Sequence, residues 1–287
     1  MLWENLREEE FDAAIQKSGK LCVVPIGCIE KHGQHLPVGT DTQTCYHIAK
    51  EAAEIEPVVV FPGLYFGDLC GLYMWKGTIA FSSELLQQML TELCAEIARN
   101  GFQKILLLNG HGGNTALLAN FLRSTAHKKK DYVVMVRNEY QYTYKDILTD
   151  IDENGESFPE LTEEDVAYLR DFAAHHYTTG HGCINETAVM NVINPDHVDM
   201  SRIDADDGTS RGRTAYLREK GIGINGSGMF WLMDYPESFS GEHLEGANAR
   251  IGKVILQKRI ALQARACQLL KQDDLVLEWN AEHNAKF

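Results

Sequence analysis

Histidine and carboxylate side chains follow two short apolar segments of this chain. The first segment leads to Glu30, His32 and Asp41, and the second leads to His111. In an open parallel sheet, ligands bind beyond the carboxyl ends of the strands, so these four side chains are expected to converge at one edge. Two imidazoles and two carboxylates are ligand types that hold zinc, manganese or iron. The sequence therefore predicts a metal site.

Local spacing supports this prediction. Glu30 and His32 stand two residues apart, so their side chains point to the same side if the strand continues that far. Asp41 follows a turn that contains Pro37 and Gly39, and it begins a helix, where the backbone amides favour a carboxylate. A carboxylate that lies between two metal ions can bridge them. Asp41 is the candidate for that role.

A third polar group precedes residues 188–190, an apolar run that marks the start of a helix. Glu186 is expected to be a further carboxylate ligand. His181 is expected to donate or accept a proton at the mouth of the site. We interpret Cys183, which lies between them, as a small buried thiol rather than a ligand.

Each of these residues also has an ordinary structural interpretation. Glu30 and His32 would form a hydrogen-bonded turn, and the glycines after His111 would form a strand-to-helix corner. Taken singly, the structural interpretation is the more common one. Taken together, complementary ligand types at two strand ends favour the metal site. Among the other histidines, His35 is expected to fix the Glu30 loop through a hydrogen bond and is a weaker ligand candidate than His32. The pair at residues 175–176 is expected on the surface.

Charge and composition exclude several classes of partner. The chain of 287 residues has 27 basic and 41 acidic residues and a net charge of −14, which argues against nucleic acid and anionic membranes. No apolar run approaches the roughly 20 residues of a membrane helix, and the acidic N-terminus lacks a signal-peptide core. Seven scattered cysteines without a Cys-x-x-Cys pair are typical of reduced thiols. We therefore expect a cytoplasmic protein with a small-molecule substrate.

Apolar runs of strand length alternate with longer segments of helical period. Strands are predicted at residues 21–27, 57–62, 104–108 and 132–136, with a short one at 78–81. Helices are predicted at residues 41–55, 83–100, 114–127 and 242–270, the second of them capped by Ser83. This order predicts an α/β fold with a mainly parallel sheet and helices on both faces.

Residues 139–179 interrupt this alternation. They are rich in Glu, Asp and Tyr, and a short helix is expected to begin near Leu161. We interpret them as an insertion in a single domain of residues 1–287, which covers the site or contacts a neighbouring subunit. The glycine-rich residues 221–228 lack the preceding strand and the Lys-Ser/Thr of a phosphate loop. No dinucleotide fingerprint follows the first strand.

Three motifs carry a family resemblance. The first is Val24-Pro-Ile-Gly-Cys-Ile-Glu-Lys-His-Gly-Gln-His-Leu-Pro-Val-Gly-Thr-Asp41. The second is Asn109-Gly-His-Gly-Gly-Asn114, and the third is His181-Gly-Cys-Ile-Asn-Glu186-Thr187. In this order and length they resemble the signature of the creatininase (creatinine amidohydrolase) family.

The resemblance implies an α/β/α sandwich, a site for two divalent ions (Zn²⁺, Mn²⁺ or Fe²⁺), hydrolysis of a C–N bond, and a homo-oligomer, usually a hexamer. It also implies the division of ligands between the two ions. Glu30, Asp41 and His111 would hold one ion, and His32, Asp41 and Glu186 would hold the other.

The chain departs from this family at the substrate rim. Creatinine-hydrolysing members carry a tyrosine and a ligating glutamate where this chain has Gly112 and Gly113, so creatinine is not the expected substrate. The family's Phe-Pro-Gly-Thr is replaced by Trp-Lys-Gly-Thr at residues 75–78. An exposed Lys-Trp pair beside a glycine suits a pocket wall, and a surface hairpin is the alternative. Substrate contacts are expected from Tyr73, Trp75, Lys76 and Asn114.

The expected reaction is metal-assisted hydrolysis. Two ions bridged by Asp41 lower the pKa of a bound water to about 7, and the resulting hydroxide attacks a carbonyl. His181, acting with Glu186 in the catalytic group, protonates the leaving nitrogen. The substrate is a small cyclic amide or formamide, or alternatively a ring ketone such as an oxidised inositol. A non-catalytic scaffold is the other alternative, and retention of every expected ligand together with His181 argues against it.

Overall fold

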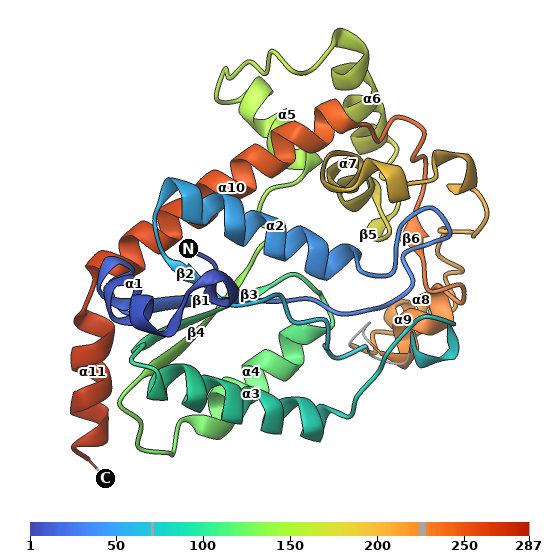
Figure 1. Ribbon diagram of the computed structural model, residues 1–287. Helices are drawn as coiled ribbons and strands as arrows, with labels where there is room; N and C mark the ends of the chain where they lie inside the picture. Colours follow the sequence, from blue (N-terminus) through green and yellow to red (C-terminus); the bar gives the residue numbers. More distant parts are fainter. Residues whose placement is uncertain (70–71, 224–227, 287) are drawn as a thin grey trace.

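A parallel sheet forms the centre of the molecule in the computed structural model, which describes residues 1–69, 72–223 and 228–286. Four strands pair in the order β2-β1-β3-β4 (Figure 1). They are β1 (Leu21–Ile26), β2 (Val59–Val60), β3 (Lys104–Asn109) and β4 (Val133–Asn138). Ile26 is in register with Asn109, and Asn109 with Asn138, so β1, β3 and β4 end at the same level. The predicted parallel sheet is confirmed.

Helices cover both faces of this sheet (Figure 1). One face packs against α2 (Thr40–Ile55), α7 (Ile184–Ile193) and α10 (Ala249–Gln272). The other face packs against α1 (Phe11–Lys17), α3 (Ser83–Arg99) and α4 (Asn114–Thr125). The result is the three-layer α/β/α arrangement that the sequence predicts.

Successive side chains of β1 point to opposite faces of the sheet and contribute to both hydrophobic cores. Leu21 and Val23 point to the layer of α2, α7 and α10, whereas Cys22 and Val24 point to the layer of α3 and α4. Every residue of β1 and β3 is buried. Because both faces of these strands are covered, β1 and the interior of β3 (residues 105–108) are continuously apolar instead of alternating.

The remaining elements lie around the edge where the strands end. The segment predicted as an insertion contains α5 (Tyr144–Asp152) and α6 (Glu163–Ala174). A two-stranded antiparallel ribbon joins β5 (Thr179–His181) to β6 (Ser240–Gly241). The other helices are α8 (Ala215–Glu219), α9 (Met229–Asp234) and α11 (Leu275–Asn284). No helix in the described part of the chain is long and apolar enough to span a bilayer.

Two predicted strands differ from the structure. Residues 78–81 form no strand, and the amide of Ile79 makes a single backbone bond to Ile29. The predicted strand at residues 57–62 shrinks to the two residues of β2. Pro57 and Pro62 flank this run, and proline lacks the amide hydrogen that a longer ladder needs.

One predicted helix start and one predicted helix cap also differ from the structure, whereas the predicted start of α3 at Ser83 is correct. The C-terminal helix begins at Ala249 instead of residue 242, because the side chain of Asn248 accepts hydrogen bonds from the amides of Arg250 and Ile251. Ser82, not Ser83, caps α3 by accepting from the amide of Leu85. Part of the glycine-rich run at residues 221–228 lies outside the described residues.

Candidate metal centre

Side chains from three neighbouring segments converge where the strands end. The loop after β1 supplies Cys28, Glu30 and His32, the first turn of α2 supplies Asp41, and the loop after β3 supplies His111. Each of the five is more than nine-tenths buried. The predicted convergence of the histidines and carboxylates is therefore observed, and Cys28 joins it.

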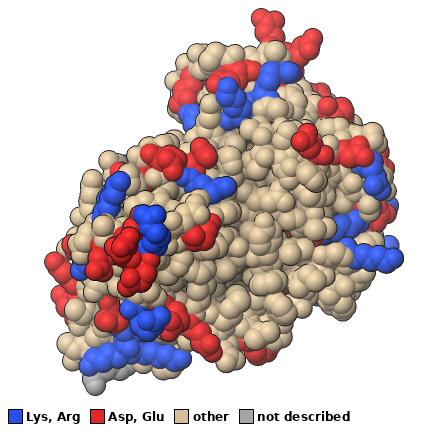
Figure 2. Space-filling model, in the orientation of Figure 1, with Lys and Arg blue, Asp and Glu red and all other residues tan. Residues whose placement is uncertain are grey.

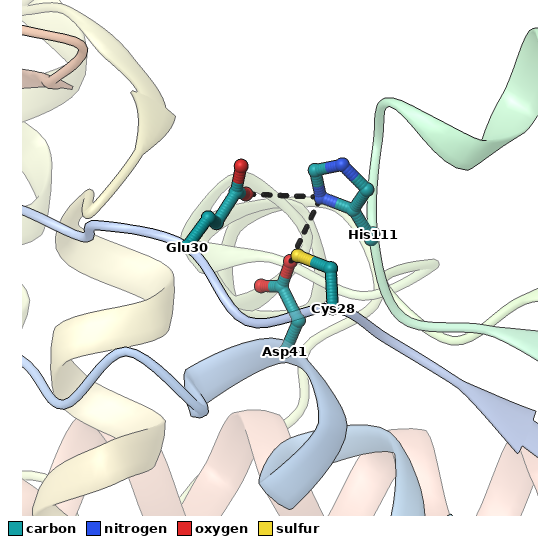
Figure 3. A group of neighbouring side chains, drawn as sticks. All are labelled: Cys28, Glu30, Asp41 and His111. Carbon is teal, nitrogen blue, oxygen red and sulfur yellow. Dashed lines mark hydrogen bonds and ion pairs between the residues drawn. The ribbon is translucent and has the colours of Figure 1, made fainter. Parts of the chain in front are cut away.

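Asp41 contacts both halves of this cluster through different oxygens. Its Oδ1 lies 2.8 Å from Nε2 of His32. Its Oδ2 lies 2.8 Å from Nδ1 of His111 and 3.1 Å from Sγ of Cys28 (Figure 3). Glu30 approaches from the opposite side, with Oε1 3.0 Å from Nδ1 of His111. The Asp41 carboxylate thus faces two groups of ligands at once.

Two residues from far along the chain complete the cluster. Glu186 lies in the first turn of α7, and its carboxylate groups with His32 and Asp41 so that the three ligand atoms are within 4.8 Å of one another. His181 ends β5, and its Nδ1 lies 3.6 Å from Oε1 of Glu30. The antiparallel ribbon and the start of α7 therefore close the site over the sheet edge.

Backbone carbonyls fix the orientation of both ligand-type histidines. Nε2 of His111 lies 2.9 Å from the carbonyl oxygen of Asp68, and Nδ1 of His32 lies 3.1 Å from that of Glu30. A carbonyl oxygen can only accept, so these two nitrogens donate. The opposite nitrogens, Nδ1 of His111 and Nε2 of His32, face the carboxylates. Metal-binding histidines commonly show this arrangement, in which the second nitrogen donates to a carbonyl.

The charges within the cluster shift its pKa values. Burial disfavours the charged form of His32, but the Asp41 carboxylate outweighs this and raises the pKa of His32 to about 10. For His111, burial is likewise outweighed, chiefly by Glu30, and its pKa lies well above the usual value. Despite burial, the two imidazolium groups hold the pKa of Asp41 well below its ordinary range. The carboxylates therefore attract positive charge, which protons or a divalent cation can supply.

The surroundings of the Glu30 carboxylate show whether the cluster can accommodate a cation. This carboxylate is completely buried and makes no hydrogen bond of good geometry to the described residues, although Oε1 has the Nδ1 atoms of His111 and His181 at 3.0 Å and 3.6 Å. Burying a carboxylate without donors is costly unless a positive charge compensates it. The donor set around Glu30 consists of carboxylate oxygens, imidazole nitrogens and one thiol, which are ligands that divalent transition metals accept. The residues fit such ions.

A cavity of about 310 Å³ opens beside the cluster. Asp41 and Glu186 form part of its wall, together with Glu139 after β4 and Lys145 in α5. Burial raises the pKa of Glu139 to about 7, although Arg259, 2.9 Å from this carboxylate, acts in the opposite direction. The cavity is therefore lined both by candidate metal ligands and by residues of the segment predicted as an insertion.

The four predicted substrate contacts lie outside this wall. Tyr73 and Lys76 are exposed, and Trp75 donates from Nε1 to Oγ of Ser238 at 2.9 Å. None of them, nor Asn114, is among the described residues that line the cavity. The buried amide of Asn114 instead holds the loop after β1 to the loop before α3. Contact between these residues and a substrate stays a prediction.

Other residues at the site were missed by the sequence reasoning. Cys28 stands two residues before Glu30, a spacing that could have indicated a shared side, and Glu139 follows a predicted strand. Arg259 carries no local signal, because its partner is far along the chain. His35, expected to fix the Glu30 loop through a hydrogen bond, does make one: its Nε2 lies 2.9 Å from Oγ1 of Thr187 and ties the loop to α7. The histidine pair at residues 175–176 is exposed, as predicted.

Comparison with known proteins adds independent information. A model of the creatininase family, described as creatinine amidohydrolase, matches residues 4–267. The creatinine amidohydrolase of Pseudomonas putida is 24% identical over 205 residues, which cover 68% of this chain and 72% of that protein. The mycofactocin precursor peptide peptidase of Mycolicibacterium smegmatis is 29% identical over 117 residues, which cover 39% of this chain and 47% of the peptidase.

Solved structures show the same fold. A mutant creatininase of Zn-Zn type superposes with a TM-score of 0.69 at 21% identity, over 95% of this chain and 98% of that chain. At this identity the likeness concerns the α/β/α architecture alone. It agrees with the order of elements and the strand pairing described above.

Proposed function

The chain belongs to the creatininase family of hydrolases, and we propose that it uses two divalent metal ions to hydrolyse a C–N bond of a small amide. The observation that carries this proposal is the shared position of Asp41, which faces His32 with one oxygen and His111 with the other. A carboxylate in this position suits a bridge between two ions. The Zn-Zn form of the related creatininase supports the same number of ions.

The ligands of the two ions follow from the two sides of Asp41. We assign Glu30 and His111 to the first ion with Asp41, because their atoms lie together around Oδ2. We assign His32 and Glu186 to the second ion with Asp41, because these three form a separate group. When bound, the two ions would supply Lewis acidity and a hydroxide nucleophile near neutral pH.

His181 is placed to move the proton that the reaction requires. Its Nε2 donates to the carbonyl oxygen of Lys31 at 2.6 Å, which fixes the imidazole ring. Its Nδ1 faces the cluster beside Glu30, and the ring centroid lies 4.2 Å from that of His32. Because Nε2 keeps its own proton, Nδ1 of His181 can take a proton from the attacking water and pass it to the leaving nitrogen when the C–N bond breaks.

The cavity indicates the class of substrate. A volume of about 310 Å³ beside Asp41 and Glu186 suits a small molecule. Its wall carries Glu139 and Lys145, so the substrate combines a scissile carbonyl with further polar groups that pair with a carboxyl and an ammonium. A small cyclic amide or a formamide has this chemistry.

The functional assignment is tested with a panel of cyclic amides, formamides and ring ketones. The protein is assayed after loading with Zn²⁺, Mn²⁺ or Fe²⁺, beside His181→Ala and the control His175→Ala, which changes an exposed histidine. Loss of a general acid lowers turnover by about 10²–10⁴-fold. We expect this loss in His181→Ala with metal content unchanged, and wild-type turnover in the control. Cleavage of ring ketones alone would replace the C–N assignment with C–C cleavage, and equal turnover in both variants would remove the role of His181.

We further propose that the protein is a cytoplasmic homo-oligomer. The six described cysteines are free and buried, which is consistent with a reducing compartment. Large apolar side chains are exposed between residues 65 and 81, namely Tyr65, Phe66, Tyr73, Met74, Ile79 and Phe81. Exposed apolar groups in one segment are typical of a protein–protein interface. A second copy of the chain is the partner that we propose for this surface.

A further inference from the structure

We propose that Cys28 is a fourth protein ligand, as a thiolate, of the ion that Glu30, Asp41 and His111 would hold. This inference rests on the proposed metal function and goes beyond its ligand assignment. A thiolate ligand from Cys28 would make one of the two metal positions selective for a thiophilic ion.

The position of Cys28 is the first argument. The residue lies just after β1, and its side chain is completely buried. Its Sγ lies 3.1 Å from Oδ2 of Asp41, and it also interacts with the imidazole of His111. One ligand atom each from Cys28, Glu30, Asp41 and His111 lie within 4.8 Å of one another (Figure 3). A single ion can therefore contact all four residues after small shifts of the side chains.

The other described cysteines have different surroundings. Cys22 and Cys94 lie in the apolar core beneath α3 and α4, and Cys267 lies in the core on the other face of the sheet. The thiol of Cys45 donates to the backbone carbonyl of Thr42 in the preceding turn of α2. Cys183 precedes α7 and lines the cavity with Glu186, but it belongs to none of the candidate metal groups among the described residues. Among the described cysteines, Cys28 thus stands out because its thiol donates to a carboxylate of the cluster.

Glu30 provides an independent sign that a cation belongs at this point. Its buried carboxylate makes no hydrogen bond of good geometry to the described residues, and the ion pair with Nδ1 of His111 at 3.0 Å involves only Oε1. The carboxylate lies in the same candidate ligand group as Sγ of Cys28. A buried carboxylate of this kind requires a positive charge, which the imidazolium of His111 supplies without metal and a bound cation supplies when that imidazole loses its proton. Glu30 shares one candidate ligand group with Cys28, Asp41 and His111 and a second one with His32 and His181, and only the first of these contains a thiol.

The proposed bond involves no redox change. When the ion binds, the S–H bond of Cys28 breaks, its proton goes to solvent, and a sulfur–metal bond forms. A thiolate favours zinc over manganese, whereas carboxylates and imidazoles alone tolerate either. The position with Cys28 is therefore expected to prefer Zn²⁺. The position with His32, Asp41 and Glu186 is expected to discriminate less.

X-ray absorption at the zinc edge of the Zn²⁺-loaded protein tests the inference directly. A Zn–S bond has a length of about 2.3 Å, whereas Zn–N and Zn–O bonds lie at about 2.0–2.2 Å. We expect a sulfur contribution in the wild type and in the matched control Cys45→Ser, and its loss in Cys28→Ser. Cys28→Ser is also expected to lower the preference for Zn²⁺ over Mn²⁺ by about tenfold or more.

The outcomes separate this inference from the function on which it rests. A loaded, active wild type with only nitrogen and oxygen around zinc would overturn the role of Cys28 and leave the proposed function intact. A wild type that binds no zinc would overturn both. A sulfur signal that persists in Cys28→Ser but disappears in Cys45→Ser would show that Cys45 supplies the sulfur, and it would contradict the proposal.

Discussion

At the scale of the residue, Asp41 has the greatest influence on the chemistry. One oxygen faces His32 and the other faces His111, and both imidazoles are oriented by backbone carbonyls. The geometry therefore exists before any ion arrives, because the surrounding hydrogen bonds already fix the ring orientations. A preorganised site loses little free energy to reorganisation when it binds its ion.

Metal binding is expected to release protons. The pKa of His32 is raised to about 10 and that of His111 lies well above its usual value, so both imidazoles keep a proton to higher pH than a free imidazole does in metal-free protein. Each must lose one proton to bind an ion, and metal affinity therefore rises as the pH rises towards 10. We expect about two protons from these imidazoles, and a third from Cys28. Calorimetric titration with Zn²⁺ in buffers of different ionisation enthalpy measures the number.

The variant Cys28→Ser serves as the internal comparison for this titration. It is expected to release about one proton fewer than the wild type, while the contribution of the two histidines persists. Zn²⁺ binding without any proton release, or with an affinity that falls as the pH rises, would contradict the assignment of His32 and His111 as ligands.

The sequence predicted the histidine and carboxylate ligands because they follow strand ends directly. Glu30 and His111 come within a few residues of β1 and β3, so the strand pattern alone places them at one edge. Cys28 was missed because a single thiol in an apolar context is usually a core residue. Arg259 was missed because its contact with Glu139 spans two elements that no local pattern connects.

At the scale of the element, the contact between α7 and α10 positions Glu186. Gly252 of α10 faces the backbone of α7, and a Cβ atom at this position would lie 1.9 Å from the carbonyl oxygen of Ala188. Ala188 follows Glu186 by two residues in the same helix. A side chain at position 252 would therefore displace the helix that carries a predicted metal ligand.

Gly252→Val is expected to destabilise the protein and to weaken the second metal position. Overpacking of a core contact costs about 1–3 kcal/mol, and backbone contact makes relief difficult here. The control is Gly223→Ala, where a Cβ atom meets nothing within 4 Å. Chemical denaturation measures stability, and elemental analysis measures metal content. Equal stability and metal content in both variants would show that α7 is not held by this contact.

Strands and helices with a clear hydrophobic pattern were predicted correctly. Element boundaries and pairings that depend on individual side-chain or long-range contacts were not. The apolar runs of β1 and β3 and the amphipathic α3 have signals in the sequence itself. The start of α10 depends on Asn248, whose capping bonds have no periodic signature. The ribbon of β5 and β6 joins short segments far apart in the chain, and no local pattern indicates such a pairing.

At the scale of the whole molecule, charge and apolar surface are distributed unevenly. Lys, Arg, Asp and Glu side chains cluster around the left and outer edges of the face in Figure 2, and a broad uncharged area crosses its centre and lower right. Phe66 and Phe81 are both exposed, and their rings pack edge to face with centroids 4.9 Å apart. We use this aromatic pair to test the proposed oligomer interface.

The oligomer prediction is tested by analytical ultracentrifugation. The wild type is expected to sediment as a homo-oligomer, a hexamer by family resemblance, and Phe66→Glu is expected to shift it towards smaller species because a charge would be buried at the interface. Ile55→Glu is the control. Ile55 is an exposed apolar residue at the C-terminal end of α2, outside the exposed apolar segment at residues 65–81. A wild type that is monomeric at all concentrations would refute the oligomer.

The overall architecture could be predicted, whereas the cavity could not. Alternating strands and helices require a parallel sheet with two helical layers, and composition alone argues against nucleic-acid and membrane partners. The cavity wall combines the first turn of α2, the end of β4, α5 and the start of α7. Its shape depends on how these elements pack, so Glu139 and Lys145 were not foreseen and the rim at residues 73–76 was chosen instead.

The central claim is that Asp41 joins two metal ions in one site. The measurement that tests it most directly is the metal content of purified wild type, Asp41→Ala and the control His175→Ala by elemental mass spectrometry, after incubation with Zn²⁺, Mn²⁺ or Fe²⁺ and removal of unbound ions. We predict about two ions per chain in the wild type and the control, and almost none in Asp41→Ala, which remains folded. A wild type without bound metal, or an Asp41→Ala variant that keeps both ions, would contradict the account.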